Sequence, residues 1–172
     1  SLRYREVAFI GDPPEKLHLG LFVDSDFAGD RADSKSTSGC FICPMGPNTF
    51  FPLNALSKKQ TAQSHSTPEA EIVAADMGLR VEGHPAYMLW KVLLGRDLEL
   101  RLYEDNEAGQ RIIVSGKFPT MRHVRRVHGV SIGALHTAYL NDQFALSDCH
   151  TKAQAADIFI KHFVDKYAWE HD

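Results

Sequence analysis

The chain has 172 residues, of which 44% are apolar and 24% are charged, and this balance predicts one globular domain with a sizeable core. No apolar run approaches the ~20 residues of a membrane span, and no charged-then-apolar leader opens the chain, so we expect a soluble, unsecreted protein without a membrane partner. The net charge of −3 argues against a uniformly basic, phosphate-binding surface.

The charge is unevenly distributed along the chain. Residues 111–141 carry five Lys or Arg, three His and no carboxylate, so this stretch has a charge of +5 and the remainder −8. Two interpretations stay open: a solvated basic helix, or a phosphate-contacting face beside an acidic site.

The sequence of the N-terminal third predicts strands joined by turns. Residues 2–10 alternate loosely enough to be a strand, and apolar residues at every second position of 17–23 predict a strand with one face buried. Two acids, Asp24 and Asp26, follow where that run stops. Residues 39–43 and 49–56 predict two more short strands, which would complete an antiparallel meander.

The three cysteines do not predict a disulfide framework, because their number is odd. Cys40 and Cys43 have C-x-x-C spacing, but they fall in an expected strand, where positions three apart face opposite sides. Only Cys149 and His150 could supplement them as metal ligands. We therefore expect buried thiols in a reducing compartment.

A helix is expected to begin at Ser66-Thr67-Pro68-Glu69, which combines a hydroxyl cap, an early proline and a Glu three residues after Ser66. Ile72, Ala75 and Leu79 form one stripe, and Glu71 lies next to that stripe. Gly83-His84-Pro85 should break or kink the helix before a second segment at 86–94.

The second half repeats the strand-then-acid arrangement. Residues 98–104 alternate as a strand and are followed by Asp105 and Asn106, residues 106–114 and 127–140 are expected to be helical, and 144–149 is the last strand. A closing helix from Ala153 would place Ala156, Ile160 and Phe163 on its inner stripe, with Asp157 adjoining it.

Four carboxylates could thus meet at one end of the sheet: Asp24, Glu71, Asp105 and Asp157. Hard divalent cations such as Mg²⁺ prefer oxygen ligands, and two such ions can clamp a phosphodiester during an in-line displacement. Converging acids repel one another without cations, so their grouping makes sense chiefly with bound metal.

Seven motifs in sequence resemble the ribonuclease H domain of copia-type retrotransposon polyproteins, from about Leu17 to Phe163. They are DSDFAGD (24–30), STSG (36–39), SKKQ (57–60), STPEAE (66–71), LYEDN (102–106), RHV (122–124) and ADIFIK (156–161). Each motif is weak alone, but seven in order are specific.

The resemblance implies an α/β, ribonuclease H-like fold: a mixed five-stranded sheet in the order 3-2-1-4-5 with helices on both faces. It also implies a single domain over 1–172, with 1–10 as a connection from an upstream reverse transcriptase and 164–172 as a C-terminal tail. The implied activity is hydrolysis of the RNA strand of RNA–DNA hybrids with two Mg²⁺ ions, for which Mn²⁺ could substitute.

The resemblance also implies residue roles. Asp24 would bridge both ions, Glu71 and Asp105 would share one, and Asp157 would complete the other. Asp26 and Glu69 remain competitors for the places of Asp24 and Glu71, and His150 is a possible aid to product release. The residues expected to contact the nucleic-acid backbone are Lys58, Lys59, Arg122, Arg125 and Arg126.

Two other functions remain open. An element-derived copy could persist as a non-catalytic structural or binding module in a larger assembly, and a transposase or integrase of the same fold is less favoured by the motif spelling. An active element would be expected to work in the cytoplasm, inside virus-like particles.

Overall fold

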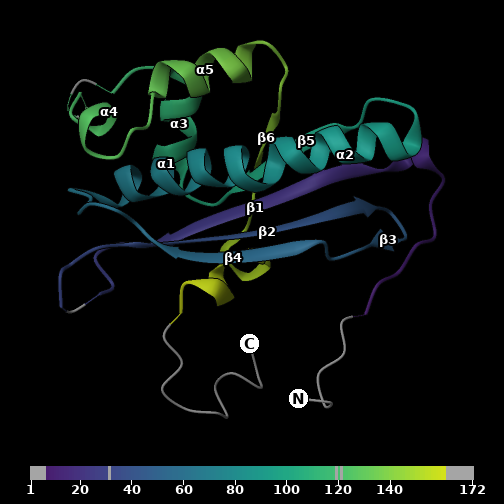
Figure 1. Ribbon diagram of the computed structural model, residues 1–172, viewed down its shortest axis with the longest axis horizontal. Coiled ribbons are helices and arrows are strands. Elements are labelled where there is room, and N and C mark those ends of the chain that lie inside the picture. The colour runs from purple at the N-terminus through teal and green to yellow at the C-terminus, as the bar shows by residue number, and fades with distance from the viewer. Residues whose placement is uncertain (1–6, 31, 119, 121, 162–172) are drawn as a thin grey trace.

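A mixed sheet, covered on one side by a layer of helices, forms the centre of the protein (Figure 1). The computed structural model describes residues 7–30, 32–118, 120 and 122–161. The strands are β1 (His18–Asp26), β2 (Thr37–Gly46), β3 (Thr49–Phe50), β4 (Asn54–Lys59), β5 (Glu99–Glu104) and β6 (Ala145–Asp148).

The sheet confirms the predicted topology. β1 is central, antiparallel to β2 and parallel to β5, and β6 is parallel to β5. Both β3 and β4 pair antiparallel with β2, so the expected third strand is split into a two-residue β3 and a separate β4. Counting β4 as the third strand gives the predicted order, with β3 as an addition.

The central strand β1 is buried on both faces, not on one as its alternation predicted. Leu21 and Val23 join the core beneath the helical layer, whereas Phe22 stacks on Tyr103 on the opposite face, with ring centroids 4.5 Å apart. β1 also extends through Asp24 and Asp26, because both residues still pair with β2. The acids therefore stand on the rigid end of a strand rather than in a turn after it.

The long helical layer begins as predicted. Ser66 caps α1 (Thr67–Gly78) by accepting a hydrogen bond from the Glu69 amide at 3.4 Å. In place of a break, the chain passes through a five-residue π-helical turn, η2 (Leu79–Gly83), into α2 (His84–Leu94). Pro85 falls in the first turn of α2, where its missing N–H is tolerated.

The predicted helix over 127–140 is confirmed only over 132–140. After α3 (Glu107–Ser115), the chain forms the short α4 (Val124–Val127) and then α5 (Ile132–Leu140). Gly129 has φ +73, in the left-handed region, so it ends the first helix, and Ser131 caps the next by accepting from the Ala134 amide.

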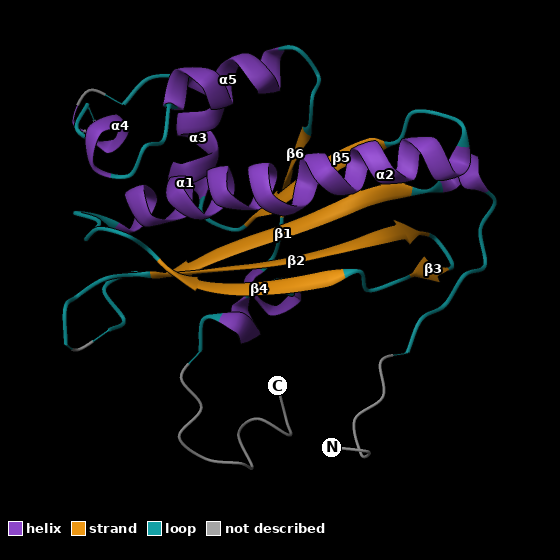
Figure 2. Cartoon of the chain, in the orientation of Figure 1, coloured by secondary structure: helices purple, strands orange, loops and turns teal. Residues whose placement is uncertain are grey.

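The opposite face of the sheet is covered by short helical turns, as Figure 2 shows below β4. They are the 3₁₀ turns η4 (Thr151–Ala153) and η5 (Asp157–Phe159), and a further 3₁₀ turn, η1 (Pro14–Lys16), precedes β1. The predicted continuous helix from Ala153 is wrong in its described part, because Gln154 is extended. Helices on both faces are nevertheless confirmed.

Some predictions fall on the termini. Within residues 7–10 the expected first strand is reduced to an isolated bridge between Phe9 and Phe50. Residues 1–6, Phe163 and the expected tail at 164–172 lie outside the described residues. No helix in the described part of the chain is long and apolar enough to cross a membrane.

The cysteines are buried, free thiols. Cys40 packs in the core beneath the helices and Cys43 in the core on the other face, as the C-x-x-C spacing within a strand predicted. Burial raises the pKa of both thiols to about 12, so neither is a reactive thiolate at neutral pH.

Candidate active site

Asp24 lies at the centre of a cluster of carboxyl groups at one end of the sheet. The parallel pairing of β1 and β5 brings the ends of both strands, and hence Asp24 and Asp105, to the same edge. Burial, followed by the charges of Asp105, Asp157 and Asp26, raises the pKa of Asp24 to about 7, against a hydrogen bond from the Ser25 amide at 2.8 Å. The two predicted strand-end acids therefore share one electrostatic environment.

Glu71 approaches the same cluster from α1. Its side chain is 3% exposed, and Oε2 accepts no hydrogen bond from a described residue. Burial raises the pKa of Glu71, as do the charges of Glu104, Asp24 and Asp105. A buried carboxyl group with an unused oxygen is suited to a cation.

Glu104 is a fifth member of the cluster and was not among the predicted site residues. It is 1% exposed, accepts from the Asn106 amide at 3.0 Å through Oε1, and has no described partner at Oε2. Burial raises its pKa, and the charges of Asp105 and Asp24 add to the effect. Leu100 and Leu102 on β5 both face the core beneath the helices. Glu104 is the next alternate residue of the strand, so this alternation could have predicted that its side chain also points inward.

Asp157 reaches the cluster from the other face of the sheet, on η5. Its charge contributes to the raised pKa of Asp24, and its Oδ2 pairs with Lys161 at 2.8 Å. The side-chain amide of Gln154 donates through Nε2 to the Val23 carbonyl at 3.0 Å, which fastens the preceding turn to β1. Asp24 thus interacts electrostatically with each of the other three predicted ligands, Glu71, Asp105 and Asp157.

A glycine lets η5 lie directly on the sheet. Gly39 pairs with Asp24 across β1 and β2. A Cβ atom at this position would lie 2.8 Å from both the Ala156 carbonyl oxygen and Ile160 Cγ2. The close approach of η5, and therefore the placement of Asp157, depends on the absence of that side chain.

The competing acids have other partners. Asp26 accepts a short hydrogen bond from the Thr37 amide and thereby ties the end of β1 to the start of β2. Glu69 faces His123 and His128 instead of the cluster. Glu69 is therefore engaged away from the cluster, whereas Asp26 pairs with Thr37 and also contributes its charge to the raised pKa of Asp24.

The His150 side chain forms a hydrogen bond within its own turn. Its Nδ1 accepts from the Lys152 amide at 3.1 Å, at the start of η4. A cleft of about 560 Å³ lies next to this turn, and Asp157 is one of the residues that line it.

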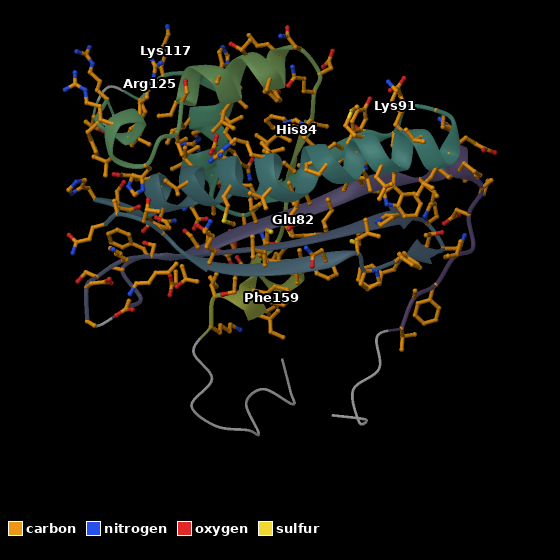
Figure 3. The ribbon with its side chains drawn as sticks, viewed as in Figure 1. Glu82, His84, Lys91, Lys117, Arg125 and Phe159 are labelled. Carbon is orange, nitrogen blue, oxygen red and sulfur yellow. The ribbon has the colours of Figure 1, made fainter. Side chains whose placement is uncertain are left out.

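The predicted cationic residues differ in availability. Lys59 is paired with Asp30 and Asp33, whereas Lys58 is exposed and makes no ion pair with a described residue. The three arginines on or beside α4 are exposed, and Figure 3 shows Arg125 on the outer side of the helical layer, with Phe159 on the opposite side of the sheet. These three are Arg122, Arg125 and Arg126.

The donor chemistry of the cluster fits a hard cation. Its members offer only carboxylate oxygens, and Glu71 and Glu104 each hold an unpartnered buried oxygen. Within the described residues, no three His, Cys, Asp or Glu side chains are already arranged to hold a metal ion. Cation binding would therefore require small rearrangements of these side chains.

No protein-family model matches the chain, but solved structures share its fold. LC11-RNase H1, solved in complex with an RNA/DNA hybrid, has a TM-score of 0.53 and 17% identity over 87% of this chain and 99% of its own. RNase H1 from the halophilic archaeon Halobacterium salinarum NRC-1 has a TM-score of 0.52 and 12% identity over 81% of this chain and 90% of its own. The chain therefore has the ribonuclease H fold.

Proposed function

We propose that this protein is a metal-dependent endonuclease that hydrolyses the RNA strand of RNA–DNA hybrids. The observation that carries the proposal is a cluster of mutually interacting acids: the charges of Asp105 and Asp157, after burial, raise the pKa of Asp24, and the charge of Asp24 in turn helps to raise the pKa values of Glu71 and Glu104. Such a concentration of carboxyl groups, in a fold shared with proteins of this activity, is characteristic of a site built for cations.

Each acid has a proposed part. Asp24, at the centre, would contact both of two Mg²⁺ ions, with Glu71 and Asp105 on one and Asp157 on the other; Mn²⁺ could substitute. Bound Mg²⁺ would supply charge neutralisation at the scissile phosphate and activation of water. Glu104 directly precedes Asp105 at the end of β5 and would add negative charge to the site.

The basic segment around α4 would hold the nucleic acid. Arg122, Arg125 and Arg126 are exposed, and Lys58 is exposed at the end of β4. Such side chains contact phosphates and position the duplex without reading its sequence. Recognition of the RNA strand would then depend on the 2′-hydroxyl near the acids.

The motif resemblance supports a retrotransposon origin. We infer that the domain follows a reverse transcriptase in its parent polyprotein and degrades the RNA template during reverse transcription. Its place of action would then be the cytoplasm, within virus-like particles.

Purified protein with Mg²⁺ should cut the RNA strand of a labelled RNA–DNA hybrid, leaving 3′-hydroxyl and 5′-phosphate ends, and should leave double-stranded DNA intact. Asp105→Asn should reduce the rate by about 10³-fold, because it removes a charge at the proposed ion site. Gel analysis of end-labelled hybrids measures both. An Asp105→Asn variant as fast as the parent would refute the proposed site.

Gly39→Ala should lower the cleavage rate more than tenfold and destabilise the fold by about 1–3 kcal/mol, because the new methyl group displaces η5 and Asp157. Thermal unfolding and hybrid cleavage measure the two effects. Gly133→Ala is the matched control, since no heavy atom lies within 4 Å of a Cβ at that position in α5. Parent-like cleavage by Gly39→Ala would show that the placement of η5 is not required.

A non-catalytic binding module is the second candidate. It is favoured by one observation: no three of the described acids, histidines or cysteines form a ready-made metal site. Hybrid binding without cleavage in both Mg²⁺ and Mn²⁺, together with a stable protein partner, would establish it. Measurable cleavage without a partner would exclude it.

A further inference from the structure

Glu69 is a buried carboxylate that three donors from separate parts of the chain surround. It is 1% exposed. His123 Nε2 lies 3.2 Å from both of its oxygens, His128 Nε2 lies 3.1 Å from Oε1, and the His65 amide donates to Oε2 at 3.1 Å. Within the described residues this cluster is not arranged as a metal site, so its contacts are hydrogen bonds.

The surroundings of His128 fix which nitrogen carries its proton. The side chain is 1% exposed, and Nδ1 has no hydrogen-bond partner among the described residues. A hydrogen placed on Nδ1 would be a buried donor without an acceptor. The Nε2–H tautomer, donating to Glu69, is therefore the favoured state.

This cluster joins two parts of the proposed site. Glu69 lies in the first turn of α1, two residues before Glu71. His123 and His128 flank α4, which carries Arg125 and Arg126. Figure 1 shows α4 beside the first turns of α1, and the contacts to Glu69 are the hydrogen bonds that link them.

We propose that Glu69, His123 and His128 form a positioning clamp that couples the grip on the nucleic acid to the placement of Glu71. The inference rests on the proposed function and adds three positioning residues to it. The clamp holds the arginine-bearing segment against the helix that delivers Glu71, so duplex binding and metal binding are sensitive to the same hydrogen bonds. Hydrogen bonds to a charged group are strong enough that their loss could weaken duplex binding and metal binding by about tenfold each.

Three substitutions separate a clamp from general stabilisation. Glu69→Gln removes the charge and one acceptor oxygen. His128→Leu removes the donor but keeps apolar bulk, whereas His128→Gln keeps an N–H near the position of Nε2. Glu99→Gln is the matched control, because Glu99 is exposed at the opposite end of β5 and pairs with Arg101.

Three measurements on the full chain report on the clamp. Amide hydrogen exchange of the metal-free protein reports on residues 67–71 and 122–128. Fluorescence anisotropy in EDTA gives the affinity for a labelled RNA–DNA hybrid. A Mg²⁺ titration of cleavage gives the half-saturating concentration. All are made at a temperature where every variant is folded.

Glu69→Gln and His128→Leu should speed exchange in both segments, weaken hybrid binding about tenfold and raise the half-saturating Mg²⁺ concentration several-fold. His128→Gln should recover most of each parent value, and Glu99→Gln should match the parent. Lower thermal stability with unchanged affinity and Mg²⁺ dependence would overturn the clamp, as would faster exchange in only one segment. Hydrogen exchange needs no activity, so failure of the clamp is distinguishable from failure of the proposed function.

Discussion

Asp24→Asn should abolish cleavage while making the metal-free protein more stable. The change removes the acid at the centre of the cluster, so we expect a rate loss of about 10³-fold or more. It also removes a carboxyl group that burial and neighbouring charges hold at a pKa of about 7. At pH 8 without metal, the free energy of unfolding should rise by roughly 2 kcal/mol, a value reduced for residual solvent access.

The opposite signs of the two effects make this a sharp test. Hybrid cleavage and denaturant unfolding in EDTA measure them on the same preparation. Asp142→Asn is the control: it makes the same change of charge in an exposed turn at φ +53, a conformation that Asn accepts. Loss of both activity and stability in Asp24→Asn would indicate a structural carboxylate instead.

The metal-free protein should lose stability as the pH rises from 5 to 8, and Mg²⁺ should restore it. Asp24, Glu71 and Glu104 all have a pKa raised first by burial and then by the charges of neighbouring carboxylates. They bind protons more tightly when folded, so their contribution is complete below about pH 4 and is lost as the pH rises through their folded pKa values. We expect a fall of about 2–4 kcal/mol across this range.

The surface acids do not contribute to the expected change in stability between pH 5 and 8. Hydrogen bonds from Lys59 lower the pKa of Asp30 and Asp33, and one from Lys91 lowers that of Asp97. These groups lose their stabilising charge only below about pH 4. Urea unfolding between pH 5 and 8, with EDTA or with Mg²⁺ at about 100 times its dissociation constant, should differ by about 2.7 kcal/mol at pH 8. A flat pH profile in EDTA would contradict the electrostatic description of the cluster.

The strands β1 and β5 and the acids at their ends were predictable because each rests on a local pattern, whereas the strand order followed from the family resemblance. Alternation located β1 and β5, the cap at Ser66 located α1, and the ordered motifs supplied the topology. The parallel pairing of β1 and β5 then brings Asp24 and Asp105 to one edge. Their catalytic roles remain predictions.

The remaining features depend on contacts that no local pattern encodes. Alternation on β1 did not show that its second face is also buried, where Phe22 stacks on Tyr103 of β5. The near-complete burial of Glu104 likewise depends on tertiary packing. Residues 127–140 keep a helical composition although Gly129 adopts φ +73. The histidine partners of Glu69 are more than 50 residues away in sequence.

The turn that carries Asp157 has a thermodynamic consequence. η5 is a three-residue 3₁₀ turn whose own hydrogen bonds, such as that from the Phe159 amide to the Ala156 carbonyl at 3.0 Å, span a short segment. It is held to the sheet by the Gln154 side chain and by its close packing against Gly39. Segments with so few local contacts open with a smaller free energy than the central strands. Detachment of η5 from the sheet is therefore a local unfolding step, in which the site comes apart while the sheet stays intact. Cation binding would favour the form in which η5 is packed on the sheet.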